Sequence, residues 1–204
     1  MSAQPKTRYT LEEYLALDRE SPERLEYWNG EIFDMSGVEP EHDAVEGNLY
    51  LALRARLEPR GCRVFLANIR IKVPSAPPYR YADLSALCGE PQYEAIGGIQ
   101  ALTNPSLLIE ALSDSTEAYD RGAKFTHYKS IPAFSEYLLV DPRTPNVTHL
   151  TREGDGRWTH REYTQMDEII KLSSVDAEIS LREIYQGVVF QPFALSRLRP
   201  IAPS

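Results

Sequence analysis

Residues 107–112 read Leu-Leu-Ile-Glu-Ala-Leu, and residues 136–140 read Glu-Tyr-Leu-Leu-Val. Both are short apolar runs, the pattern of strands that are covered on both faces of a sheet. Between them, residues 120–130 predict a helix. A buried strand, a helix and a second buried strand in this order indicate an α/β fold.

Upstream of this stretch, two local signals define the N-terminal part of the chain. Thr10-Leu-Glu-Glu13 is a capping box, because the first hydroxyl can accept a helical N–H while the glutamate reaches back, so a helix is expected to about residue 19. Asn29-Gly30 separates two apolar runs and predicts an antiparallel hairpin, since both residues tolerate positive φ. The other expected elements are a helix over 40–57, strands over 62–66, 68–73 and 79–88, a loop over 89–102, and short strands over 147–150, 158–163 and 169–172.

Together these elements predict an α/β fold with a mixed central sheet flanked by helices and a small antiparallel extension. The 204 residues suit one domain, which we expect to span residues 1–185. Residues 186–204 contain three prolines and no acidic residue, and we expect them to form an extended tail. Because the tail and the extension resemble an arm and an interface, we also expect a homodimer.

The composition excludes several classes of protein. Twenty-two Lys and Arg against thirty Asp and Glu give a net charge of −8, which excludes a small domain with a wholly basic surface. The apolar runs are too short for a membrane helix and the N-terminus lacks a signal-peptide core, so we expect no membrane partner and a cytoplasmic location. Cys62 and Cys88 form no CxxC pair, and we expect two reduced thiols rather than a disulfide scaffold.

Two carboxylates occupy strands that should be apolar: Asp83 within residues 81–88, and Glu110 within residues 107–112. A buried carboxylate is costly unless a cation, a metal or a raised pKa offsets the burial. Either residue could instead cap a helix or pair with an arginine. Hard oxygen ligands on adjacent strands suit Mg²⁺ or Mn²⁺. The helix that follows carries Lys124, one of only five lysines in the chain.

Further motifs in the same order make the pattern more specific. They are Tyr14, Arg24-Leu-Glu26, Asn29-Gly-Glu-Ile32, His42, Cys62-Arg-Val-Phe65, Asn68-Ile-Arg70, Tyr81-Ala-Asp83, and the runs 107–116, 119–128 and 131–142. With these motifs the chain resembles the Uma-two family of endonucleases, within the restriction-endonuclease-like PD-(D/E)XK superfamily. The resemblance covers about residues 10–150 and does not include the tail.

The resemblance implies a mixed sheet with a divalent metal site. Asp83 matches the family's metal-binding aspartate, and Glu110 matches its second acidic ligand. Lys124 matches the catalytic lysine. The resemblance implies that this lysine lies on the helix after the strand rather than on the strand itself. Glu26 and Glu31 lie in the hairpin as candidates for an additional ligand, and Glu26 is favoured.

Three features depart from the pattern. Ala82 replaces the proline that usually precedes the aspartate, which changes backbone shape rather than chemistry. Leu112 stands where the superfamily places its lysine, two residues after the glutamate. Lys72 is therefore a rival to Lys124, because it shares one strand face with Asn68 and Arg70. The third departure is the acidic net charge, which requires any phosphate-binding surface to be local.

The implied function is a metal-dependent endonuclease that hydrolyses phosphodiester bonds in DNA. Arg70, Lys72, Arg121 and His42 are candidate substrate contacts, and the guanidinium groups of the two arginines match phosphate oxygens. Two alternatives stay open at this point. Leu112 and the charge of −8 also suit an inert interaction module with a nuclease fold, and two carboxylates could serve a hydrolase of another substrate, such as a glycoside.

Overall fold

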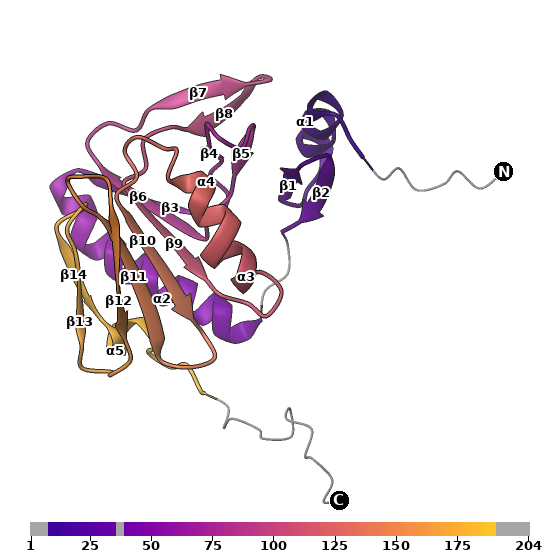
Figure 1. Ribbon diagram of the computed structural model, residues 1–204. Helices are drawn as coiled ribbons and strands as arrows, with labels where there is room; N and C mark the ends of the chain where they lie inside the picture. The colour runs from indigo at the N-terminus through magenta and orange to yellow at the C-terminus, as the bar shows by residue number, and fades with distance from the viewer. Residues whose placement is uncertain (1–7, 36–38, 191–204) are drawn as a thin grey trace, which may run out of the picture.

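The computed structural model describes residues 8–35 and 39–190, and its centre is a six-stranded sheet (Figure 1). In spatial order the strands are β12 (Trp158–Tyr163), β11 (Asn146–Arg152), β10 (Glu136–Asp141), β9 (Leu107–Ala111), β6 (Leu84–Cys88) and β3 (Cys62–Leu66). Only β9 and β10 pair in parallel, and the other neighbours are antiparallel. The predicted mixed sheet is confirmed.

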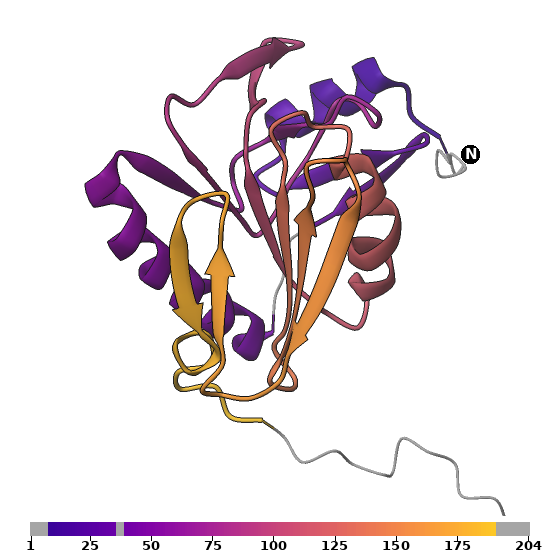
Figure 2. The same cartoon turned by 60° about the vertical axis from the view of Figure 1, so that its left-hand side comes forward.

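Helices cover both faces of this sheet, as Figure 2 shows. Leu107, Ile109 and Ala111 of β9 pack with α2 (Pro40–Leu57), while Leu108 and Leu112 join the core beside the helix over residues 117–128. This alternation follows from the two-residue period of a strand. It places Glu110 on the face of the sheet that the helix over residues 117–128 covers.

The remaining elements form small sheets and short helices around this centre. They are α1 (Leu11–Glu20), β1 (Leu25–Trp28), β2 (Glu31–Asp34), η1 (Glu58–Arg60), β4 (Ile71–Lys72), β5 (Tyr79–Arg80), β7 (Tyr93–Ile96), β8 (Ile99–Leu102), β13 (Ile169–Leu172), β14 (Ala177–Ser180) and α5 (Leu181–Ile184). The Thr10–Glu13 capping box is present. No helix in the described ranges is both long and apolar enough to span a bilayer. Most of the predicted tail, residues 191–204, lies outside the described residues.

Three expectations about the strands were wrong in detail. The run over 79–88 is two strands, β5 and β6, which belong to different sheets. Residues 89–102 are not a loop but contain the β7–β8 hairpin, with Gly97 and Gly98 at positive φ in its turn. The segments over 147–150 and 158–163 join the central sheet as β11 and β12, so the small antiparallel sheet consists of β13 and β14.

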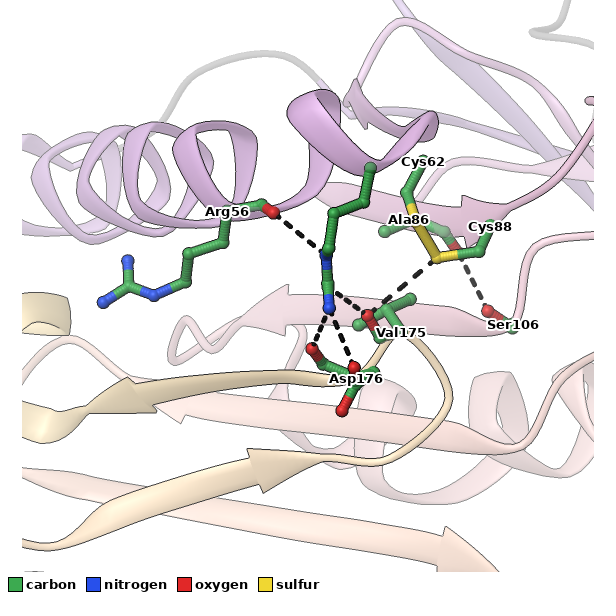
Figure 3. Close-up of a disulfide and its surroundings, with 8 residues drawn as sticks. Arg56, Cys62, Ala86, Cys88, Ser106, Val175 and Asp176 are labelled. Carbon is green, nitrogen blue, oxygen red and sulfur yellow. Dashed lines mark hydrogen bonds and ion pairs between the residues drawn. A yellow bond between two sulfur atoms is a disulfide. The ribbon is translucent and has the colours of Figure 1, made fainter.

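The expectation of two reduced cysteines was also wrong. Cys62 and Cys88 are directly opposite in the β3–β6 register, and their sulfur atoms are bonded (Figure 3). Arg60 donates hydrogen bonds to the backbone carbonyls of Asp176 and Val175, at 2.6 and 2.7 Å. Figure 3 labels these two residues beside the disulfide, in the turn between β13 and β14. A disulfide that closes a loop of this size contributes about 2–4 kcal/mol. The cysteines therefore no longer support a cytoplasmic location.

Glu136 makes a buried polar connection between the sheet and the turn after β13. Its side chain accepts hydrogen bonds from the backbone N–H groups of Ser173 and Ser174, at 2.9 and 2.8 Å, and lies 3.1 Å from Nε2 of His149. Burial alone would raise the pKa of Glu136, but the hydrogen bonds from His149 and Ser174 lower it below its ordinary value of 4.5.

This network predicts a pH dependence of stability. Because the folded pKa of Glu136 lies below the unfolded one, the unfolded chain binds more protons, and the free energy of unfolding should decrease as the pH falls below about 4.5. Urea unfolding of Glu136→Gln between pH 7 and pH 3 should show a shallower decrease than the parent. Glu162→Gln, on the exposed surface of β12, is the control, and equal slopes for Glu136→Gln and the parent would contradict the prediction.

Candidate active site

Asp83 lies directly before β6, and Glu110 lies on the neighbouring strand β9. The antiparallel register of β6 and β9 pairs Leu84 with Ile109, and one further step pairs Asp83 with Glu110. Opposite residues of an antiparallel pair project on the same face of the sheet. Asp83 directly precedes β6, so the break between β5 and β6 places its carboxylate at the end of the strand. The predicted convergence of these two acids is present in the fold.

Both carboxylates line a cleft of about 590 Å³. One wall comes from the N-terminal hairpin and the residues flanking it, through Arg24, Asp34 and Met35. The other walls come from the loop over 113–116, from the helix that follows it, and from Arg143 after β10. The cleft therefore brings together segments that are more than 100 residues apart in the chain.

Asp83 is held by two donors from different elements. The backbone N–H of Ala111 donates to its Oδ2 at 2.8 Å, and Nε2 of His42 in α2 lies 3.4 Å from the same oxygen. Burial would raise the pKa of Asp83, but the hydrogen bond and charge of His42, the charge of Lys124 and the Ala111 N–H lower it. The carboxylate is thus kept ionised in a mostly buried position.

The helix over residues 117–128 presents three buried polar residues to the site. It consists of α3 (Glu117–Tyr119), the π-helical segment η2 (Asp120–Lys124) and α4 (Phe125–Tyr128). Asp120, Lys124 and Tyr128 are four residues apart and are all buried. Side chains at this spacing share one face of a helix, and π-turns recur at functional sites.

Glu110 receives two of these side chains on one oxygen. Nζ of Lys124 lies 3.0 Å from Oε1, and the Tyr128 hydroxyl donates to the same atom at 3.0 Å. The Lys124 ammonium also lies 3.3 Å from Oδ1 of Asp120. Burial would lower the pKa of Lys124, but the carboxylates of Glu110 and Asp120 raise it well above its ordinary value. Burial raises the pKa of Glu110, which Lys124 opposes.

The donor set fits a hard divalent cation. Within the described residues, Oδ1 of Asp83 and Oε2 of Glu110 accept no hydrogen bond and make no ion pair, because the contacts described above use the other oxygen of each carboxylate. The described part of the chain holds no group of three or more His, Cys, Asp or Glu side chains arranged for a metal. Mg²⁺ needs only one or two protein carboxylates, because it retains waters and uses substrate phosphates as further ligands. Asp83 and Glu110, which both line the cleft, can supply that number of carboxylates.

Among the other predicted site residues, His42 lines the cleft, but the rest lie elsewhere. Glu26 is buried in β1, where its Oε1 accepts the Tyr81 N–H at 2.8 Å. Lys72 pairs with Glu94 of β7. The two remaining residues, Arg70 and Arg121, contact neither Asp83 nor Glu110. Arg70 pairs with Asp18 at 2.7 Å, and Arg121 pairs with Glu117 at 2.9 Å.

Several residues in or beside the cleft were not predicted from the sequence as part of the site, among them Asp120, Tyr128, Arg24 and Arg143. Asp120 and Tyr128 could have been found, because each is four residues from Lys124 and helical spacing puts all three on one face. Arg24 and Arg143 line the cleft from separate segments, and no local pattern connects them to the site. Tyr128 packs in the core, and its hydroxyl contacts Glu110.

With this geometry in place, comparisons with known proteins decide the family. A family model, Uma2, described as "Putative restriction endonuclease", matches residues 11–182. The chain belongs to the Uma2 family. The resemblance inferred from the motifs is therefore confirmed, and it extends beyond the predicted residues 10–150.

Individual relatives of this Uma2 protein agree with that assignment. The uncharacterized protein slr1290 of Synechocystis is 30% identical over 186 residues, covering 91% of this chain and 96% of its own. The uncharacterized protein sll1609 from the same organism is 32% identical, covering 73% and 84%. A crystal structure titled as a "putative nuclease belonging to DUF820" from Anabaena variabilis has a TM-score of 0.71 at 20% identity, covering 89% of this chain and 99% of its own. That likeness shows a shared fold.

Proposed function

We propose that this Uma2 protein is a divalent-metal-dependent endonuclease that hydrolyses phosphodiester bonds in DNA. The observation that supports it is the convergence of Asp83 and Glu110 on one face of the sheet, with Lys124 at 3.0 Å from Glu110 inside a cleft. Two carboxylates and one cation of this kind can hold a hard metal ion and stabilise a charged phosphate.

Asp83 and Glu110 would hold Mg²⁺ or Mn²⁺. A bound divalent ion would supply Lewis-acid polarisation of the scissile phosphate and of the attacking water. Lys124 places a permanent positive charge beside these carboxylates, where it can stabilise negative charge that develops on the phosphate oxygens. His42 and the Ala111 N–H keep the Asp83 carboxylate ionised and oriented.

The charges along the cleft support a need for metal. Its carboxylates outnumber its lysines and arginines: Asp34, Glu39, Asp83, Glu110, Asp114 and Asp120 against Arg24, Lys124 and Arg143. A polyanion entering this cleft is repelled unless a divalent ion offsets part of the negative charge. The acidic net charge of the chain is thus compatible with a phosphodiester substrate when an ion is bound.

We favour Lys124 over Lys72 as the catalytic lysine. Lys124 is buried against Glu110, whereas Lys72 lies on β4 with Glu94 as its partner. Arg24 lines the cleft and is better placed for a phosphate than Arg70 and Arg121. Arg143 also lines the cleft, but it pairs with Asp114, Glu117 and Asp141. The homodimer and the cytoplasmic location stay predictions from the sequence.

An inert nuclease-like interaction module is the second candidate. It is favoured by the ion pair between Lys124 and Glu110, which neutralises a proposed ligand, and by the lack of a three-residue metal cluster among the described residues. Such a module should neither bind a divalent ion tightly nor cleave DNA. These two properties separate the candidates.

The test is relaxation of supercoiled plasmid by the purified protein with Mg²⁺ or Mn²⁺. We expect nicking with either ion and its loss in excess EDTA, with recovery when the ion is restored. Glu162→Gln, exposed on β12, should behave like the parent. No metal-dependent nicking at any protein concentration, together with no Mn²⁺ binding by calorimetry, would favour the inert module.

A further inference from the structure

Lys124 is shared between two buried carboxylates that belong to different elements. Its ammonium lies 3.0 Å from Oε1 of Glu110 on β9 and 3.3 Å from Oδ1 of Asp120 on its own helix. All three side chains are at least 97% buried. A buried ammonium needs a carboxylate partner, because its desolvation is otherwise uncompensated.

The backbone of Asp120 is hydrogen-bonded on both sides, but one oxygen of its side chain accepts no hydrogen bond. Its backbone N–H donates to the Thr116 carbonyl at 2.9 Å, and its own carbonyl accepts the Tyr137 hydroxyl at 3.3 Å. Its Oδ1, by contrast, is buried and accepts no hydrogen bond within the described residues, and Lys124 is the cation beside it. A buried carboxylate oxygen that accepts no hydrogen bond depends on a neighbouring cation to offset its desolvation, and Lys124 is that cation.

A divalent ion on Glu110 would compete with Lys124 for the same carboxylate. Both are cations, and at a separation of a few ångströms they repel each other strongly in a buried site. Lys124 already lies within contact distance of Asp120, so its ammonium can leave Glu110 without losing its only anionic partner. The i,i+4 spacing on one helix keeps this second partner in reach.

We propose that Asp120 is the positioning residue for Lys124, and that it retains the ammonium when a divalent ion takes the carboxylate of Glu110. This inference rests on the proposed metal-dependent function. Lys124 then acts as an internal counterion that neutralises Glu110 while the ion is absent. Asp120 makes the exchange possible without leaving the buried ammonium unpaired.

The test measures Mn²⁺ affinity of the full chain by titration calorimetry. Asp120→Asn should weaken binding about tenfold or more, because Lys124 then has Glu110 as its only close carboxylate. Lys124→Met, which removes the competing charge, should tighten binding about tenfold or more. The double variant with Asp120→Asn and Lys124→Met should bind Mn²⁺ with nearly the same affinity as Lys124→Met alone. Asp120→Glu should restore most of the affinity that Asp120→Asn loses.

The control is Asp155→Asn, the same acid-to-amide change at an exposed loop position, which should bind Mn²⁺ like the parent. An equal loss from Asp120→Asn in the parent and in the Lys124→Met background would make Asp120 a direct ligand and overturn the inference. Unchanged affinity in Asp120→Asn, or no gain in Lys124→Met, would also overturn it. If Asp120→Asn does not fold, the smaller neutral variant Asp120→Ser takes its place in both backgrounds. Absence of Mn²⁺ binding by the parent would instead refute the proposed function.

Discussion

Asp83→Asn should reduce metal-dependent plasmid nicking by about 100-fold or more while the protein stays folded. The substitution keeps the shape of the side chain but removes the negative charge that would hold a divalent ion. Loss of a residue that only supports a ligand already costs about 10–100-fold, so loss of a ligand should cost at least the upper figure. The measurement is the initial rate of plasmid nicking in Mn²⁺.

The amide at this position can still accept the Ala111 N–H, so we expect little change in thermal unfolding. Mn²⁺ affinity should fall together with the nicking rate, which ties the lost activity to the ion. Glu162→Gln again serves as the exposed control. Nicking by Asp83→Asn at the parental rate would remove Asp83 from the proposed site.

Glu26→Ala should lower the free energy of unfolding by about 3–5 kcal/mol, as expected when one member of a buried ion pair is removed. Glu26 accepts the Tyr81 N–H at 2.8 Å and lies 3.9 Å from Nε of Arg80, which is only 2% exposed. Without the carboxylate, that N–H loses its acceptor and the Arg80 charge stays buried. The measurement is urea unfolding at neutral pH.

A second measurement decides between two roles for Glu26. The sequence predicts an additional metal ligand, whereas its contacts indicate support for the segment that leads to Asp83. The milder variant Glu26→Gln should keep its Mn²⁺ affinity within about threefold of the parent, well short of the change expected for a ligand. A loss of tenfold or more in a folded Glu26→Gln protein would show that Glu26 is a ligand.

The local parts of the fold followed from local chemistry. The Thr10 capping box, the Asn29-Gly30 hairpin and the helix over 40–57 were predicted to within about a residue. A cap or a two-residue turn acts through neighbouring backbone groups, so its signal is complete within a few residues. The β7–β8 hairpin was missed although Gly97-Gly98 is a turn signal, because its short strands carry weak alternation.

The candidate site was partly visible in the same way. Asp83 and Glu110 were found because a carboxylate within an apolar run is unusual whatever surrounds it. The choice between Lys72 and Lys124 could not be made from spacing, since each shares a face with other polar residues. That choice depends on which strand and which helix pack beside Glu110.

Residue type and periodicity along single segments were enough to predict the class of fold and to select the two carboxylates that carry the proposed chemistry. The family followed from the resemblance of the ordered motifs over about residues 10–150. The contact of Lys124 with Glu110 and the bond between Cys62 and Cys88 appear only once the chain is folded, because each depends on strand register or helix packing between residues distant in the chain. The four-residue spacing places Asp120 near Lys124 on the helix, but the burial that makes this ion pair matter comes from packing against the sheet.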